Sequence, residues 1–490
     1  MNLPSGESIK NKEGIEDLSI AGSKAFNLAK VKRSGYDVPE FFIIPLASFT
    51  NQVVLSSKED AGSEIQSNIE EDLMALLDLF NSEFYSIRSS FSDEDVKDGQ
   101  NPGAYVTLVD VEKADVPVVL REIINNYWSK GIPTANGSII IQEMILGDVS
   151  GITYTSDPAG DQEGNSKMII EVNSGGNEEI TSGSSIPVRY SFDKRSESLD
   201  VLPSFNKNQG DIDYLDIFIR SPSILKTFTD LASLFNKPLD IEWTLKDGKT
   251  FILQARPIVS VNRSRTPSGI QFVPKSTASI YAYYRIPTHL RRHMLMSAAL
   301  ANLILDNWSG SQINRALVTK VLLTHDLGNI VKDPASRFGS SYSTNTNYWS
   351  AVRKSMIRRY GKDDHDVTIK IVRDELKLGD EVIQLLGNKN FIKNEETFRN
   401  KDYVVKLAAY CDQKIGPLGV MDLSERLEEA KVRYSGIKDA SVSSDWFEEL
   451  KGYGLAIEKQ LQEFCSQDLT KITNGDLDLY LKQLKRYRFD

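Results

Sequence analysis

The chain of 490 residues has four histidines, and all fall in one stretch of its second half: His289, His293, His325 and His365. His325 is followed directly by Asp326 at the end of an apolar helical segment, so an imidazole and a carboxylate can bind one ion from a single helix turn. Two further helical segments carry His293 and Asp412. Because helical domains build metal sites from side chains on facing helices, these four residues are predicted to converge on one metal ion.

Other residues near this set allow two interpretations each. His289 lies one helical turn before His293 and competes with it for the role of first ligand. His365 stands at a helix start, where it serves either a second metal or a substrate phosphate, or else only a capping turn. Three basic residues offer phosphate contacts but are equally well explained as solvated helix charges: Arg291, Arg292 and Lys406.

Two short segments of the first half carry groups suited to phosphate. Lys24 follows a Gly-Ser turn at the start of a helical pattern, where free backbone N–H groups and the helix dipole favour an anion. Arg88 follows an apolar run and precedes two serines, and guanidinium and hydroxyl groups bind phosphate oxygens. Taken alone, each segment is typical of a solvated surface.

A hairpin is predicted over residues 239–257, turning at an Asp-Gly pair. Its loop is expected to span three residues, 246–248, which sets Asp240 opposite Gln254. Four polar side chains then share one face: Asp240, Glu242, Gln254 and Arg256. A two-residue turn is expected to separate the carboxylates from the amide, because side chains alternate along a strand. Carboxylate and amide oxygens side by side suit Mg²⁺, whereas the alternative is an amphipathic surface hairpin.

Taken in order, these segments resemble the nucleotide-binding domain of phosphoenolpyruvate synthase, pyruvate phosphate dikinase and rifampicin phosphotransferase, an ATP-grasp fold. The resemblance extends through residues 103–108, 141–144, 150–158 and 170–176 and covers nearly the whole first half. It implies ATP binding by Lys24, Arg88, Gln142, Glu143, Met144, Glu171 and Asp240. It also implies Mg²⁺ at Glu242 and Gln254, and stabilisation of the transferred phosphoryl group by Arg256.

The sequence departs from those enzymes in two respects. Lys24 follows Gly-Ser where the family usually has Gly-Gly. No Thr/Gly-rich loop ends in a phosphate-carrying histidine, and no barrel domain is recognisable. Phosphorylation of pyruvate by this chain alone is therefore not expected.

The second half, over roughly 280–433, resembles the HD superfamily of metal-dependent phosphohydrolases. The pattern of that family is a histidine, a His-Asp pair and a distant aspartate, here His293, His325, Asp326 and Asp412. The resemblance implies a divalent metal (Mn²⁺, Mg²⁺, Fe²⁺ or similar), with His325 and Asp326 catalytic and His365 as an additional ligand. Such an ion lowers the pKa of a bound water, so that hydroxide attacks phosphorus.

The elements that position these residues differ between the two halves. Short β-branched runs alternate with helical patterns up to about residue 258, whereas amphipathic helical stretches dominate after residue 269. The expected fold is an α+β ATP-grasp half followed by an all-α HD-type half. The expected domains are 1–260 and 270–490, joined by a polar linker at 261–269.

Composition excludes several classes of protein. A hydrophobic content of 40% and a charged content of 26% are typical of a folded globular chain. A net charge of −10 argues against a constitutive nucleic-acid or anionic-membrane surface. Two cysteines, Cys411 and Cys465, are too few for a disulfide framework, and no bilayer span or signal segment is recognisable, so a cytoplasmic location is expected. The oligomeric state stays open.

The sequence predicts a bifunctional enzyme that binds ATP and a small-molecule substrate. One half is expected to transfer a phosphoryl group from ATP, and the other to hydrolyse a phosphoester of a small metabolite or nucleotide. An alternative makes the first half a non-catalytic ATP sensor that regulates the hydrolase. A wholly degenerate scaffold is hard to reconcile with two complete sets of ligands.

Overall fold

The computed structural model describes residues 10–11, 15–49, 73–80, 82–92, 106–129, 137–157, 166–174, 187–202, 219, 221–258, 272–332, 346–388, 391–435 and 444–489. The expected linker at 261–269 lies outside these residues. So do parts of the segments that carry the first resemblance, namely 93–95, 103–105, 158 and 175–176.

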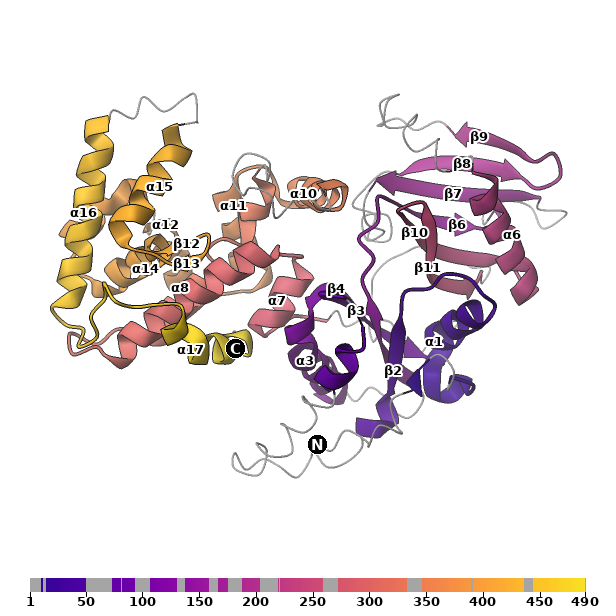
Figure 1. Ribbon diagram of the computed structural model, residues 1–490, viewed down its shortest axis with the longest axis horizontal. Helices are drawn as coiled ribbons and strands as arrows, with labels where there is room; N and C mark the ends of the chain where they lie inside the picture. The colour runs from indigo at the N-terminus through magenta and orange to yellow at the C-terminus, as the bar shows by residue number, and fades with distance from the viewer. Residues whose placement is uncertain are drawn as a thin grey trace. The chain divides into compact units, whose positions relative to one another are not determined.

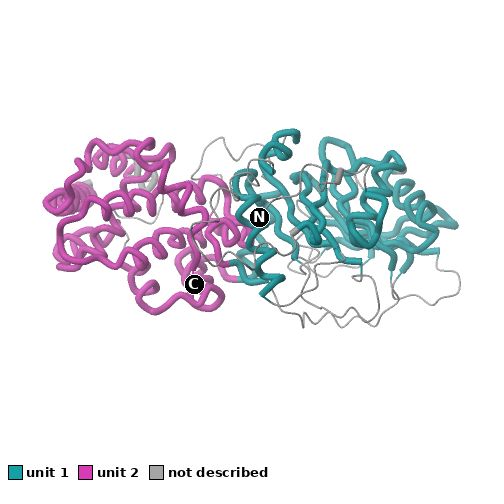
Figure 2. Tube along the Cα trace, turned by 90° about the horizontal axis from the view of Figure 1, so that it is seen from below, with its two compact units in different colours: residues 1–274, 342–359 teal, residues 275–341, 360–490 magenta. Residues whose placement is uncertain are grey.

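The chain forms two compact units (Figure 2). The first contains residues 1–274 and 342–359, and the second contains residues 275–341 and 360–490. The division after residue 274 lies five residues beyond the end of the expected linker. The described part of the second range, 346–359, was expected in the C-terminal half, but it belongs to the first unit, where Tyr348 is buried against Asp110.

The first sheet of the first unit has five antiparallel strands (Figure 1). In spatial order they are β1 (Lys10–Asn11), β2 (Phe41–Pro45), β5 (Gly137–Glu143), β3 (Phe84–Phe91) and β4 (Thr107–Glu112). The central strand β5 is a run of isoleucines, Ile139, Ile140 and Ile141, all at most 1% exposed. Such continuous β-branched burial is typical of a strand covered on both faces. The helices α1 (Leu18–Arg33) and α3 (Val116–Ser129) pack against this sheet.

The second sheet has six antiparallel strands. In spatial order they are β11 (Lys249–Pro257), β10 (Leu239–Lys246), β6 (Val149–Tyr154), β7 (Lys167–Ser174), β8 (Val188–Asp193) and β9 (Ser198–Leu202). The helix α6 (Pro222–Phe235) packs on β10, where Phe228 lies 5.5 Å from the Trp243 ring. The first unit is thus mixed α and β with two antiparallel sheets, whereas the second is helical.

The strand pairing of the β10–β11 hairpin differs from the expected register. Its turn has two residues, not three, because Asp247 and Gly248 both adopt positive φ, of 50° and 75°, as a type I′ turn requires. A bulge between Ile252 and Gln254 then shifts the pairing by one residue, so Glu242 lies opposite Gln254 and Asp240 opposite Arg256. The shorter turn by itself would place the carboxylates and Gln254 on opposite faces of the hairpin. The one-residue shift at the bulge returns them to the same face, so the four polar side chains share one face as expected.

The second unit is built from helices around a buried core. They are α7 (Thr277–Tyr283), α8 (Thr288–Asp306), α9 (Arg315–Thr324), α11 (Asp364–Lys370), α12 (Asp380–Asn388), α13 (Asn394–Arg399), α14 (Tyr403–Lys414), α15 (Leu423–Ser435), α16 (Ser444–Gln462) and α17 (Asp478–Lys485). Single turns follow α9 and α11 and precede α13, at η4 (Leu327–Val331), η7 (Ile371–Glu375) and η8 (Phe391–Lys393). The helix α10 (Thr346–Tyr360) crosses the division between the units, which falls after Arg359.

Helix starts in the second unit follow their capping residues. The side chains of Asn314, Asp363 and Asp402 each accept a hydrogen bond from a backbone N–H in the first turn of α9, α11 and α14. A short hairpin of β12 (Ile415–Gly416) and β13 (Gly419–Val420) departs from the expected all-α character. Among the described helices, none combines the length and apolar character needed to cross a bilayer.

Candidate metal centre and nucleotide site

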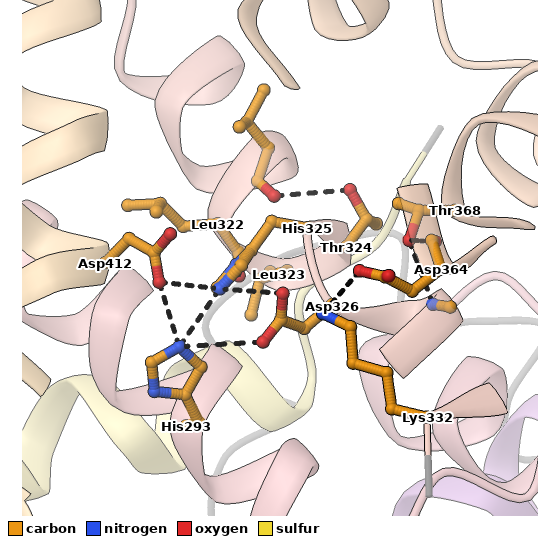
Figure 3. Close-up of polar contacts among 12 residues, drawn as sticks. His293, Leu322, Leu323, Thr324, His325, Asp326, Lys332, Asp364, Thr368 and Asp412 are labelled. Carbon is orange, nitrogen blue, oxygen red and sulfur yellow. Dashed lines mark hydrogen bonds and ion pairs between the residues drawn. The ribbon is translucent and has the colours of Figure 1, made fainter. Parts of the chain in front are cut away.

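Three helices of the second unit bring together four side chains of types that can bind a metal ion (Figure 3). His293 comes from α8, Asp412 from α14, and His325 and Asp326 from the end of α9. The Nε2 atoms of the two histidines lie 3.1 Å apart. Oδ1 of Asp412 lies 3.0 Å from Nε2 of His293 and 3.1 Å from Nε2 of His325. Each histidine Nε2 also lies 3.8 Å from an oxygen of Asp326.

These separations fit the ligand set of one divalent ion. Bonds of about 2.1 Å to nitrogen or oxygen at right angles place neighbouring ligand atoms about 3.0 Å apart. The three shortest separations in the cluster, 3.0 to 3.1 Å, match that edge, and the 3.8 Å separations need only a small adjustment. Among the described residues, His293, His325 and Asp326 form the one group that could hold an ion by mutual proximity of their donor atoms.

The His325 imidazole is held in the form that binds metals. Its side chain is fully buried, and its Nδ1 lies 2.8 Å from the backbone oxygen of Leu322. Because a carbonyl oxygen only accepts, Nδ1 carries the proton and Nε2 offers its lone pair to the cluster. Asp326, Asp412 and His293 are instead about one-fifth exposed, so water or a substrate can reach the other side of the site.

The glycine after the His-Asp pair allows a second helix to approach. A Cβ on Gly328 would stand 2.0 Å from the backbone oxygen of Asp364, so only glycine fits there. Its backbone N–H donates to the Thr368 hydroxyl of α11 at 2.9 Å. This contact fixes α11 beside η4 and brings His365 to the rim of the site, where it is exposed.

The cluster opens into a cavity of about 800 Å³. His289, His293, His325, Asp326, His365 and Asp412 all line it. His289 lies outside the group of apposed donor atoms, and burial, followed by the nearby His293, lowers its pKa to about 4. The structure therefore brings His293 rather than His289 to the other three ligands.

Two of the three expected phosphate contacts are wrong. Arg291 is 1% exposed, and its guanidinium donates to backbone oxygens of Ile286 and Tyr281. Lys406 is 3% exposed and donates to the Phe398 backbone oxygen and to Gln460. Both side chains are structural, because each already satisfies buried acceptors.

The basic side chains that do line the cavity are Arg292, Lys332, Lys393 and Arg426. Sequence reasoning missed three of these, because they lie far apart in the chain: Lys332 directly after η4, Lys393 in η8 and Arg426 in α15.

The polar face of the β10–β11 hairpin brings together part of the expected nucleotide site. Glu242 and Gln254 are paired across the two strands. Arg88 of β3 lies beside them, with Nη1 4.0 Å from Oε2 of Glu242 and 3.1 Å from the backbone oxygen of Leu253. Arg256 donates from Nε and Nη2 to Oδ2 of Asp240, at 3.1 and 2.8 Å. An acidic and amide pair flanked by two arginines suits a magnesium-bound phosphate.

The other residues of the expected nucleotide site do not all lie in one place. Four of them, Arg88, Gln142, Glu143 and Met144, line one cavity of about 20 Å³. Tyr348 of α10 lines it too, and its hydroxyl donates to Asp110 at 2.5 Å. This volume is far below the several hundred Å³ of a typical ligand pocket.

Lys24 and Glu171 lie outside the lining of that cavity. The Lys24 ammonium donates to the backbone oxygen of Ser89 at 3.2 Å. Lys24 lies two residues after Gly22, whose φ of 75° interrupts α1. Glu171 pairs with Arg189 at 3.0 Å on neighbouring strands. The structure thus does not gather the whole expected set at one point.

Comparison with known proteins finds relatives for the N-terminal half. An uncharacterized phosphotransferase, YvkC, of Bacillus subtilis is 23% identical over 53% of this chain and 36% of its own length. A probable phosphoenolpyruvate synthase of Archaeoglobus fulgidus is 24% identical over 51% of this chain and 41% of its own length. A rifampicin phosphotransferase of Bacillus subtilis is 24% identical over 50% of this chain and 35% of its own length. No family model matches the chain.

These relatives are phosphotransferases, so the N-terminal half is similar to a nucleotide-binding domain of the phosphoenolpyruvate synthase type. The chain spans about two-fifths of the length of the curated relatives that it matches. The helical unit with the histidine–aspartate cluster is outside the similarity that these relatives support.

Proposed function

We propose that this chain is a bifunctional enzyme, with a metal-dependent phosphohydrolase in its second unit and an ATP-dependent phosphotransferase in its first. The observation that carries the hydrolase is the convergence of two imidazoles and two carboxylates at the wall of a cavity of about 800 Å³. The phosphotransferase rests on the similarity of the N-terminal half to phosphotransferases and on the polar face of the hairpin.

The hydrolase would hold its ion with His293, His325, Asp326 and Asp412. When bound, a divalent ion there supplies Lewis-acid activation of water for attack on phosphorus. The protein's own groups do the rest. The hydrogen bond from His325 to the Leu322 carbonyl keeps one ligand oriented, and the basic side chains Arg292, Lys332, Lys393 and Arg426 neutralise the phosphate.

The phosphotransferase would bind Mg²⁺ with oxygens of Glu242 and Gln254. Arg88 is within 4.0 Å of Glu242 and would contact the ATP phosphates. Arg256, oriented by two hydrogen bonds to Asp240, would stabilise the transferred phosphoryl group. In the hydrolase, His365 would serve as an additional metal ligand or as a phosphate contact.

Two single substitutions separate the activities. Wild type, Asp326→Ala and Glu242→Ala are incubated with Mn²⁺, Mg²⁺, ATP and p-nitrophenyl phosphate, and phosphorus nuclear magnetic resonance follows both substrates. We expect Asp326→Ala to lose at least 100-fold in ester hydrolysis and keep ATP turnover, and Glu242→Ala to do the reverse.

Equal hydrolysis by wild type and Asp326→Ala would rule out the hydrolase. Loss of ATP turnover only in Asp326→Ala would rule out the phosphotransferase and favour an ATP sensor. Asp445→Ala, which removes an exposed carboxylate on α16, serves as the control and should match wild type.

One observation favours this second candidate, a sensor that regulates the hydrolase. Tyr348 lines the small cavity among the residues expected along the adenine, and α10 lies in sequence between α9 and α11 of the helical unit. Seating a nucleotide in a cavity of about 20 Å³ would require α10 to move. Under this candidate, Tyr348→Ala tightens ATP binding and alters hydrolysis without any ATP turnover.

A further inference from the structure

We propose that the cavity at the metal cluster takes an organic phosphate whose non-phosphate part is apolar, such as an alkyl or aryl phosphomonoester. This inference rests on the proposed hydrolase function and specifies its substrate class. It follows from a division of the cavity wall into charged and apolar parts contributed by different elements.

The charged part of the wall selects an anion. Besides the cluster itself it includes Lys332, directly after η4, and Asp364 and His365 of α11. Lys332 pairs with Asp364 at 2.5 Å, which offsets that carboxylate (Figure 3). The lining then contains three further basic side chains, Arg292, Lys393 and Arg426, and the two carboxylates of the cluster, so a divalent ion leaves the site with a net positive charge.

The apolar part of the wall comes from α12, η8, the β12–β13 turn and α15. Its side chains are Leu386, Phe391, Ile392, Leu418 and Leu427. Ile392 is 55% exposed and Leu418 is 79% exposed, which places both among the most exposed large hydrophobic residues of the described chain. Exposed apolar groups that gather at the edge of a cavity are typical of a binding surface.

The turn that carries Leu418 is fixed in place beside the metal ligands. The Arg292 guanidinium, one residue before His293, donates to the Leu418 backbone oxygen at 3.2 Å. Asn474 donates to the same oxygen at 3.1 Å and accepts from the Val420 backbone N–H at 2.8 Å. Because these hydrogen bonds hold the turn in place, Leu418 loses little conformational entropy when a ligand binds. An exposed leucine that is preorganised in this way points to a ligand contact.

The size of the cavity agrees with this division. About 800 Å³ lies within the range of pockets that enclose drug-sized ligands, and a phosphate with a short polar substituent would fill only a small part of it. An apolar body would displace water from the walls formed by α12 and α15, which a small polar phosphate would leave wet.

Binding of n-alkylphosphonates to the full-length protein loaded with Mn²⁺ tests this inference. Phosphonates keep the phosphate-like head but resist hydrolysis, so calorimetry reports binding alone. Each buried methylene strengthens binding by up to about fourfold. We expect the dissociation constant to fall at least about 30-fold from methylphosphonate to hexylphosphonate.

Two variants at exposed positions locate the effect. Leu418→Ser and Ile392→Ser should weaken hexylphosphonate binding about fivefold or more and leave methylphosphonate binding unchanged. Leu479→Ser on α17 is 66% exposed and outside the cavity lining, and should bind both ligands as wild type does. An affinity independent of chain length, or no phosphonate binding at all, would overturn the inference.

Hydrolysis of methyl and hexyl phosphate, measured in parallel, separates this inference from the proposed function. Chain-length-dependent phosphonate binding without hydrolysis of either ester supports an apolar organic phosphate as the ligand of the cavity and rules out the hydrolase. Hydrolysis of both esters with equal kcat/KM, and flat phosphonate affinities, supports the hydrolase and sinks the substrate class.

Discussion

His289 and His293 are one helical turn apart on α8, yet their imidazoles have different surroundings. His293 faces the other ligands, with Nε2 3.0 Å from Asp412 and 3.1 Å from His325. Burial, followed by the nearby His293, lowers the pKa of His289 from its ordinary 6.5 to about 4. One residue is therefore suited to a metal, and the other is kept neutral in the folded protein.

The depressed pKa of His289 predicts an acid-sensitive stability. The unfolded chain protonates this imidazole below pH 6.5, whereas the folded chain resists protonation until about pH 4. The stabilisation is thus present above pH 6.5 and is lost as the pH falls toward 4. We expect metal-free wild type to lose about 2 kcal/mol more than His289→Gln between pH 7.5 and 5, measured by urea unfolding. Equal losses in the two proteins would contradict this.

The two thiols of the chain should be unreactive in the folded state. Burial, followed by the charge of Asp412, raises the pKa of Cys411 well above its ordinary value, and burial also raises that of Cys465. Because the thiolate is the nucleophile, both are protected. We expect a chromogenic disulfide reagent to modify neither cysteine within minutes in buffer and both in urea. A fast reaction in buffer that Cys411→Ser removes would show that α14 opens.

At the scale of elements, the position of α14 decides whether Asp412 reaches the cluster. Lys414 follows two residues later and is 1% exposed, with Nζ 2.9 Å from Oε2 of Glu458 on α16. The Tyr410 hydroxyl donates to the same oxygen at 2.9 Å. A buried ion pair of this kind fixes the rotation of α14, and so aims Asp412 at the other ligands.

Breaking that pair should destabilise the helical unit. Glu458→Ala leaves the Lys414 ammonium buried without its carboxylate, which costs about 3–5 kcal/mol. Replacing both partners, as in Lys414→Met with Glu458→Leu, should recover most of the loss. Chemical unfolding measures both, with Lys459→Ala at an exposed position of α16 as control, expected within about 0.5 kcal/mol of wild type. Equal stability of Glu458→Ala and wild type would contradict a structural role for the pair.

At the scale of the whole molecule, α10 belongs to two parts of the chain. Its body packs in the first unit, while its last residue, Tyr360, lies in the second and donates to Glu375 there at 2.7 Å. The two compact units are therefore not two consecutive pieces of sequence.

Removing one hydroxyl tests this arrangement. Tyr348→Phe deletes the donor to Asp110, a carboxylate with no exposed surface. Weakening the solvation of a buried acceptor costs about 1–3 kcal/mol. We expect the free energy of unfolding of the first unit to fall by that amount, and the free energy of unfolding of the helical unit to stay unchanged. An unchanged first transition would mean that α10 does not pack there in solution.

The sequence by itself determined what depends on neighbours along the chain. The helical stretches and the hairpin at 239–257 follow from local periodicity and turn residues. It also named the imidazole and carboxylate set of the cluster, because few residue types bind metals and the chain has only four histidines.

The tertiary structure alone decided which residues meet. It paired Glu242 with Gln254 through a bulge that no local signal marks, and it buried Arg291 and Lys406 against backbone oxygens. It also brought the basic side chains of Lys332, Lys393 and Arg426 to one cavity and placed Tyr348 beside Asp110. Contacts between segments far apart in sequence depend on packing of the whole core, which periodicity does not encode.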